Sequence, residues 1–143
     1  MSVKIILFLL LASISFPLVA QDRRETAARE IFNKWTAEGV SFKTGFEPDG
    51  TQNLVVMAQE SFATANGYFP LQLTAKAGVK SVLRVYTRKT LGCSRSFGLP
   101  QLDIGANLPA TGVTEFAIPA ARKGQKLVGM CAMGMYTFTI TFL

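Results

Sequence analysis

From residue 53 to the C-terminus the chain is a series of short segments of alternating apolar and polar residues, and this pattern restricts it to a β fold. Turn-forming Gly, Pro and Asn residues separate the segments, and no helical pattern lies between them. The expected strands cover residues 53–61, 68–75, 81–87, 114–118, 125–131 and 136–142. Short strands in such a succession favour an antiparallel β-sandwich. In the second strand we expect Phe69, Leu71 and Leu73 to share one face.

A single amphipathic helix is expected ahead of the strands, over residues 22–38. Asp22 can cap its N-terminus, with Glu25 three residues later, and Gly39 is a suitable stop. Its apolar stripe consists of Ala27, Ala28, Ile31, Phe32 and Trp35. An amphipathic helix usually packs on its own core, with Trp35 as an anchor; a partner or membrane surface is the alternative.

The first twenty residues have the layout of a secretory signal peptide. Lys4 precedes an apolar run over residues 5–11, and small residues end at Ala20, after which we expect cleavage. The run is shorter than the roughly 20 residues that span a membrane. We therefore expect an exported chain with a leader over 1–20, a helix and linker over 21–50, and a β domain over 51–143.

The charge of the chain is moderately basic. There are 15 Lys and Arg residues against 9 Asp and Glu, a formal net charge of +6, and +5 remains once Lys4 leaves with the leader. The basic residues are scattered and do not alternate with aromatic ones, so nucleic acid is not an expected partner.

The chain contains no histidine, and this excludes several kinds of chemistry. Ser94 and Ser96 have no imidazole base for a Ser-His-Asp hydrolase, and a cysteine nucleophile would lack its usual partner. Two thiolates without imidazole also leave a zinc site short of ligands. No pair of carboxylates has a spacing that suggests acid–base catalysis. We expect a binding protein and not an enzyme.

Sulfur is concentrated near the C-terminus. Cys93 and Cys131 each lie at the end of a predicted strand, and three of the five methionines fall in the stretch Met130-Cys-Ala-Met-Gly-Met-Tyr136. Met130 is expected to face the core, whereas Met133 and Met135 flank a glycine in a tight loop. Thiolate and thioether are soft ligands that select Cu(I) and, by extension, Ag(I).

Residues 53–143 resemble the cupredoxin-like domains of bacterial periplasmic proteins, in a branch with a Cys-x-Met-Gly-Met copper loop. The segments that carry this resemblance are Asn66-Gly-Tyr-Phe-Pro70, Leu73-Thr-Ala-Lys-Ala-Gly78, Val82-Leu83-Arg84-Val85, Gly92-Cys-Ser-Arg-Ser-Phe97, Leu99-Pro100, Leu108-Pro-Ala-Thr-Gly112, Glu115-Phe116, Lys123-Gly124 and Cys131-Ala-Met-Gly-Met-Tyr136. The last segment is the most specific. The helix lies outside the resemblance.

The resemblance implies a Greek-key cupredoxin-like β-sandwich with a sulfur-rich copper site. Cys93 and Cys131 would be thiolate ligands, with Met135 the first-choice thioether and Met133 the second. In this resemblance Cys93 takes the place of the upstream histidine of blue-copper proteins. An all-sulfur set favours Cu(I) over electron transfer. The implied role is to hold or deliver periplasmic copper, with a copper-donor or copper-acceptor protein as partner.

Two alternatives remain open at this stage. An exported chain with two cysteines commonly forms a disulfide, which would give a metal-free interaction module. The other alternative is a redox or electron-transfer accessory. Arg95 and Phe97, beside Cys93, either shape the site or belong to the loop surface and the core.

Overall fold

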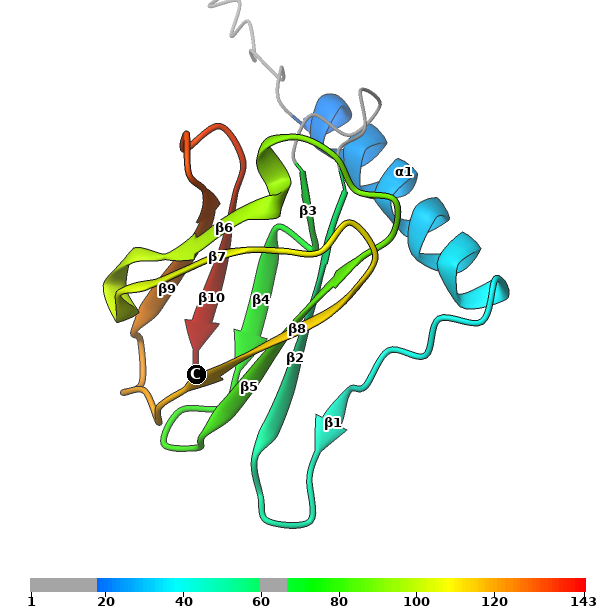
Figure 1. Ribbon diagram of the computed structural model, residues 1–143. Helices are drawn as coiled ribbons and strands as arrows, with labels where there is room; N and C mark the ends of the chain where they lie inside the picture. The colour runs from blue at the N-terminus through cyan, green and yellow to red at the C-terminus, as the bar shows by residue number, and fades with distance from the viewer. Residues whose placement is uncertain (1–17, 60–66) are drawn as a thin grey trace, which may run out of the picture.

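The computed structural model describes residues 18–59 and 67–143, and within these ranges the chain forms two five-stranded β-sheets and one α-helix (Figure 1). The elements are α1 (Leu18–Ala37), β1 (Gly45–Phe46), β2 (Gln52–Ala58), β3 (Tyr68–Phe69), β4 (Gln72–Ala75), β5 (Ser81–Thr87), the 3-10 turn η1 (Cys93–Arg95), β6 (Ser96–Leu99), the 3-10 turn η2 (Pro100–Leu102), β7 (Ile104–Asn107), β8 (Gly112–Ile118), β9 (Lys126–Cys131) and β10 (Thr137–Phe142). The mainly β architecture is therefore confirmed.

The two sheets have mixed strand directions. The first has the order β1-β2-β5-β8, with β3 also paired to β2, and the second has the order β4-β10-β9-β6-β7. The pairs β2–β5 and β4–β10 are parallel, so the expectation of a purely antiparallel sandwich was wrong. Between β2 and β5 the chain crosses to the second sheet to form β4, and it returns in its original direction.

The expected strand over residues 68–75 is in fact two strands in different sheets. Pro70 separates β3 from β4, because proline has no N–H to donate to a ladder. Phe69 packs against the cluster around Trp35, whereas Leu73 packs against the core between the sheets. The prediction that these side chains share one face was therefore wrong. Sequence patterns also missed β6 and β7, which are short and contain glycine.

The main hydrophobic core lies between the two sheets. Leu83, Val85, Phe138 and Ile140 are among its fully buried members. Tyr68 packs edge-on against Phe138, with ring centroids 5.3 Å apart. Strands β2 and β5 are buried on both faces, because α1 covers the face that is turned away from this core.

Helix α1 packs on the outer face of the first sheet, on the side of β2 and β3 (Figure 1). Trp35 is only 4% exposed and forms a second cluster with Met57 and Tyr86. The prediction that the helix serves its own domain is thus confirmed. Among the residues that the structure describes, no helix has the length and apolar character needed to cross a membrane.

The ends of α1 differ from the prediction at one side only. The helix begins at Leu18, so Asp22 lies inside it and is not the N-cap. It ends at Ala37 and is followed by Gly39 with φ of +91°, as expected for a glycine stop. The predicted leader lies outside the described residues except for positions 18–20.

Docking of α1 can be tested at Trp35. Trp35→Ala should lower the free energy of unfolding by about 3–5 kcal/mol, the usual cost of emptying an aromatic site. The matched control is the exposed Asn33 on the same helix. Asn33→Ala should change the free energy of unfolding by about 0.5 kcal/mol or less. Urea titration followed by circular dichroism measures both. Equal midpoints for the two variants would contradict the packing of the helix on the sheet.

Candidate metal centre

Cys131 is the last residue of β9 and has 0% exposure. The chain turns back at once: the Cys131 amide donates to the carbonyl of Tyr136 (3.0 Å), and the Gly134 amide donates to the carbonyl of Cys131 (2.8 Å). Gly134 has φ of +67°, a conformation that strains any residue with a side chain. The loop between β9 and β10 is therefore a tight connection that holds Cys131 in the core.

Cys93 approaches from a different part of the chain. It opens the 3-10 turn η1 and is half-buried against the inter-sheet core, so the expectation that it ends a strand was wrong. The turn is joined to β9 by the strand that follows, because Phe97 of β6 pairs with Cys131. In addition, the Ala132 amide donates to the carbonyl of Ser96 (2.7 Å). Figure 1 shows η1 and the β9–β10 loop at the same end of the molecule.

The side chains of Cys93 and Cys131 are in hydrogen-bond contact. No disulfide joins these two described residues. The two thiols that the sequence placed in one site are therefore brought together, although they are 38 positions apart in the sequence.

The Cys131 sulfur lies among hydrogen-bond donors. Burial acts to raise the pKa of this thiol, but the hydrogen bond from Cys93 and backbone N–H groups of Tyr136, Met135 and Met133 outweigh it, and the pKa falls below its ordinary value of 9.0. Donors of this kind stabilise the thiolate, which is the form of cysteine that binds metal.

Tyr68 lies beside both thiols. Its hydroxyl donates to the carbonyl of Ser94 (3.1 Å), the residue after Cys93. Burial raises the pKa of Tyr68, and the neighbouring Cys131 and Cys93 act in the same direction. The hydroxyl therefore stays protonated and remains a donor over the physiological pH range. Sequence patterns gave no sign of this contact, because Tyr68 is a typical strand residue.

The two loop methionines are on the surface. Met133 is 75% exposed and Met135 is 61% exposed, although their backbone N–H groups point at the Cys131 sulfur. Met130 is half-exposed on the face of β9 opposite Cys131. The prediction that Met130 faces the core was wrong, because side chains alternate along a strand and Cys131 takes the inner position.

The residues next to Cys93 have structural roles. Phe97 is buried below the site, stacked on Phe116 with ring centroids 4.9 Å apart. Arg95 donates through Nε to the carbonyl of Leu108 (2.8 Å) and so fixes the segment before β8. Of the two readings that the sequence left open, the core applies to Phe97 and a structural contact to Arg95.

The available ligands at this end are sulfur atoms. In the described ranges no three His, Cys, Asp or Glu side chains gather into a group that could hold a metal ion. A third ligand for a metal at the two thiols would therefore have to be a thioether, another protein atom or an external ligand. This donor set suits a soft monovalent ion.

The chain is similar to known proteins in its structure and not in its sequence. No protein-family model and no curated protein sequence matches it. One similar solved structure is the metal-binding domain of the Cu(I)-exporting P-type ATPase CopA of Streptococcus pneumoniae D39, solved with Cu(I). Its TM-score is 0.56 at 15% identity, and the match covers 73% of this chain and 99% of that one.

A second similar structure is the solution structure of a copper-binding protein in its apo form. Its TM-score is 0.57 at 17% identity, covering 73% of this chain and 100% of that one. At these identities the likeness shows a shared fold. Both neighbours are copper-binding domains by their descriptions.

Because hydrogen-bond donors lower the pKa of Cys131 from its ordinary value, we predict that the stability of the metal-free protein depends on pH. A thiol with a lower pKa in the folded state than in the unfolded chain stabilises the fold as pH rises from the folded pKa towards about 9. Its contribution is lost as pH falls through the folded value. Urea titrations of the reduced protein at several pH values should therefore show a rise in unfolding free energy over this interval.

Two variants isolate the cause. Cys131→Ser removes the titrating group, so this part of the pH dependence should disappear. Cys93→Ala removes one hydrogen-bond donor to the Cys131 sulfur. The pKa of Cys131 should then rise, and the pH dependence should become smaller. Equal pH dependence in wild type and Cys131→Ser would contradict the assignment.

Proposed function

We propose that this protein binds Cu(I) through a Cys/Met site in the periplasm of a Gram-negative bacterium and acts there as a carrier, buffer or metallochaperone. In this proposal the β domain is a cupredoxin-like Greek-key sandwich, and Cys93 and Cys131 are thiolate ligands. Met135 and Met133 are the thioether candidates. The partner that we expect is a copper-donor or copper-acceptor protein.

The observation that carries the proposal is the contact of two unbridged thiols at one end of the sandwich. Cys131 is buried among donors that favour its thiolate, and Cys93 adjoins it. A metal held by both sulfurs as thiolates would displace the thiol protons, which would be released to solvent. Copper-binding domains with a similar fold add support from outside the chain.

The oxidation state follows from the ligand types. Imidazole supports the Cu(II)/Cu(I) couple, but the chain has no histidine. Thiolates and thioethers are soft and favour Cu(I). Holding and releasing reduced copper is therefore favoured over electron transfer. Ag(I) has the same preference for sulfur and would fit the same ligands.

The exposed thioethers fit a role in exchange. Met133 and Met135 are free to change rotamer on the surface, which takes picoseconds to nanoseconds for exposed side chains. Their own backbone N–H groups donate to the Cys131 sulfur, so the backbone of both residues lies next to the site. In this proposal one of these thioethers turns towards the metal at the thiols, and the variants below test which one.

A competition titration with a Cu(I) chelator tests the ligands. Cys93→Ser and Cys131→Ser should each lower Cu(I) affinity by more than the roughly 10- to 100-fold that changes around metal ligands cost. Met135→Leu and Met133→Leu should lower it less, because a thioether carries no charge. Wild-type affinity in either cysteine variant would overturn the ligand assignment.

Two methionines provide matched controls. Met130→Leu changes a half-exposed thioether on the opposite face of β9, and Met57→Leu changes a buried one below α1. Neither should alter Cu(I) affinity. A loss in Met130→Leu equal to that in Met135→Leu would show that the thioether effect is not specific to the loop.

Thiol counting and absorption spectra separate the alternatives. In protein purified without oxygen, a thiol assay should count two thiol groups. The protein should remain colourless after it has bound Cu(I). No thiols before reduction and no copper uptake after it would support a disulfide-bridged interaction module instead. A strong thiolate-to-Cu(II) band in the visible would support an electron-transfer protein.

A further inference from the structure

The start of β3 lies between the two segments that carry the thiols. Gly67 and Tyr68 are both buried. They contact Ser94, the residue after Cys93, and Gly67 also contacts Tyr136, which closes the loop after Cys131. One short stretch of chain therefore touches the neighbours of both cysteines.

Gly67 fits this place because it has no side chain. A Cβ added to it would lie 2.8 Å from Cδ2 of Tyr136 and 2.9 Å from Cβ of Ser94. The Ser94 atom is fixed to its own backbone, and the base of the Tyr136 ring is only 3.2 Å away at Cγ. A methyl group here would push Ser94 and Tyr136 away from β3.

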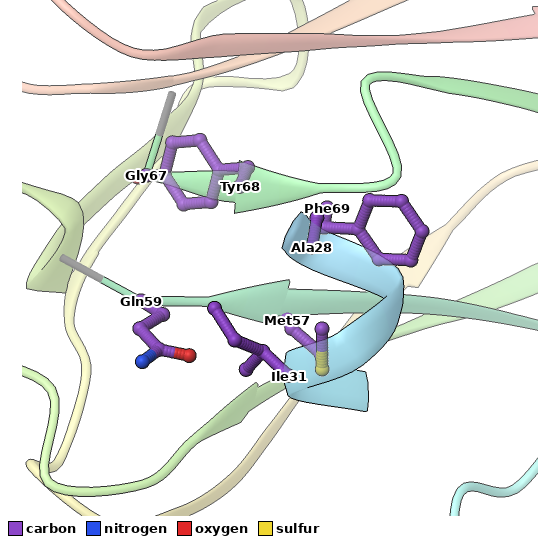
Figure 2. Close-up of a pocket in the computed structure, with 7 residues that line it drawn as sticks. All are labelled: Ala28, Ile31, Met57, Gln59, Gly67, Tyr68 and Phe69. Carbon is purple, nitrogen blue, oxygen red and sulfur yellow. The ribbon is translucent and has the colours of Figure 1, made fainter. Parts of the chain in front are cut away.

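The strand has little room to retreat from such a group. Figure 2 shows Gly67 and Tyr68 beside a hollow that Ala28 and Ile31 of α1 also line. Its accessible volume is about 10 Å³, enough for about one water molecule. The Gln59 amide donates to the carbonyl of Gly67 (2.8 Å) and holds the strand to β2.

Tyr68 acts on the other side of the same contact. Its ring packs edge-on against Phe97 and Phe138 in the core. Its hydroxyl donates to the carbonyl of Ser94. The ring is therefore fixed from below, and the hydrogen bond fixes the height of η1 above the core.

We propose that Gly67 and Tyr68 are positioning residues that set the gap between the Cys93 and Cys131 sulfurs. Gly67 allows Tyr136 and Ser94 to approach β3 closely, and Tyr68 ties Ser94 to the core. As a statement about copper affinity this rests on the proposed function; as a statement about thiol spacing it concerns the metal-free protein.

Two pairs of variants test the proposal. Tyr68→Phe removes one hydroxyl, and Tyr86→Phe is its control, since Tyr86 is also buried and its hydroxyl accepts from the Lys43 amide (2.9 Å), in the cluster below α1. Gly67→Ala adds the methyl group. Gly105→Ala is its control, because a Cβ there meets nothing within 4 Å.

Two measurements are made on each folded variant. The first is Cu(I) affinity by chelator competition. The second uses no metal: equilibration with reduced and oxidised glutathione, in which two protein thiols and one glutathione disulfide give a protein disulfide and two glutathione thiols. The equilibrium constant reports how readily the sulfurs meet. The urea midpoint is recorded alongside.

Tyr68→Phe should lower both constants by about fivefold, the order of effect of one lost hydrogen bond. Tyr86→Phe should change neither, even where it lowers the urea midpoint. Gly67→Ala should lower both constants by more than fivefold. Gly105→Ala should change neither constant. If Gly67→Ala does not fold, the tyrosine pair decides the question.

Wild-type values of the glutathione constant in Tyr68→Phe would overturn the proposal. So would a fall in copper affinity with an unchanged glutathione constant, since the hydroxyl would then act other than through thiol spacing. If the wild type takes up no Cu(I), the proposed function fails, and the glutathione constants still test the positioning.

Discussion

The buried sulfur of Cys131 sits at the end of β9, where it is surrounded by hydrogen-bond donors and is not tied up in a disulfide. An ionisable group in a core is costly unless it is hydrogen-bonded. Here the donors come from the loop that follows and from Cys93. Three features place these donors around the Cys131 sulfur and so define the candidate site. They are the tight turn at Gly134, the contact of η1 with β9 and the position of Cys93.

Three separate parts of the chain meet at this end: the start of β3, the turn η1 and the β9–β10 loop. They are held over an aromatic floor in which Tyr68, Phe97 and Phe138 pack on one another. On the opposite face of the first sheet, α1 covers β2 and β5 through Trp35. The first sheet is thus covered on both faces, and the loop between β9 and β10 carries the two exposed methionines next to Cys131.

Sequence patterns located most of the strands but misjudged their partners. Alternation marks a strand by its own residues, so β5, β8, β9 and β10 were found nearly in place. The same signal says nothing about which strand lies alongside, and the parallel pairs were missed. Pro70 split one predicted strand into two that belong to different sheets. The weak strands β6 and β7 depend on the neighbours they pair with, because their own residues carry little preference.

The sequence by itself determined which soft metal ligands the chain can offer: two thiols and a loop with two thioethers, with no imidazole anywhere. It also determined that a helix with an apolar stripe precedes a β domain. Only the tertiary structure decided that the thiols touch, that Met130 points away from them while Met133 and Met135 reach the surface, and that Gly67 and Tyr68 stand between the cysteine segments. Ligand types belong to single residues and can be seen in a sequence. Spacing and burial come from contacts between distant segments, and these exist only once the sheets have packed.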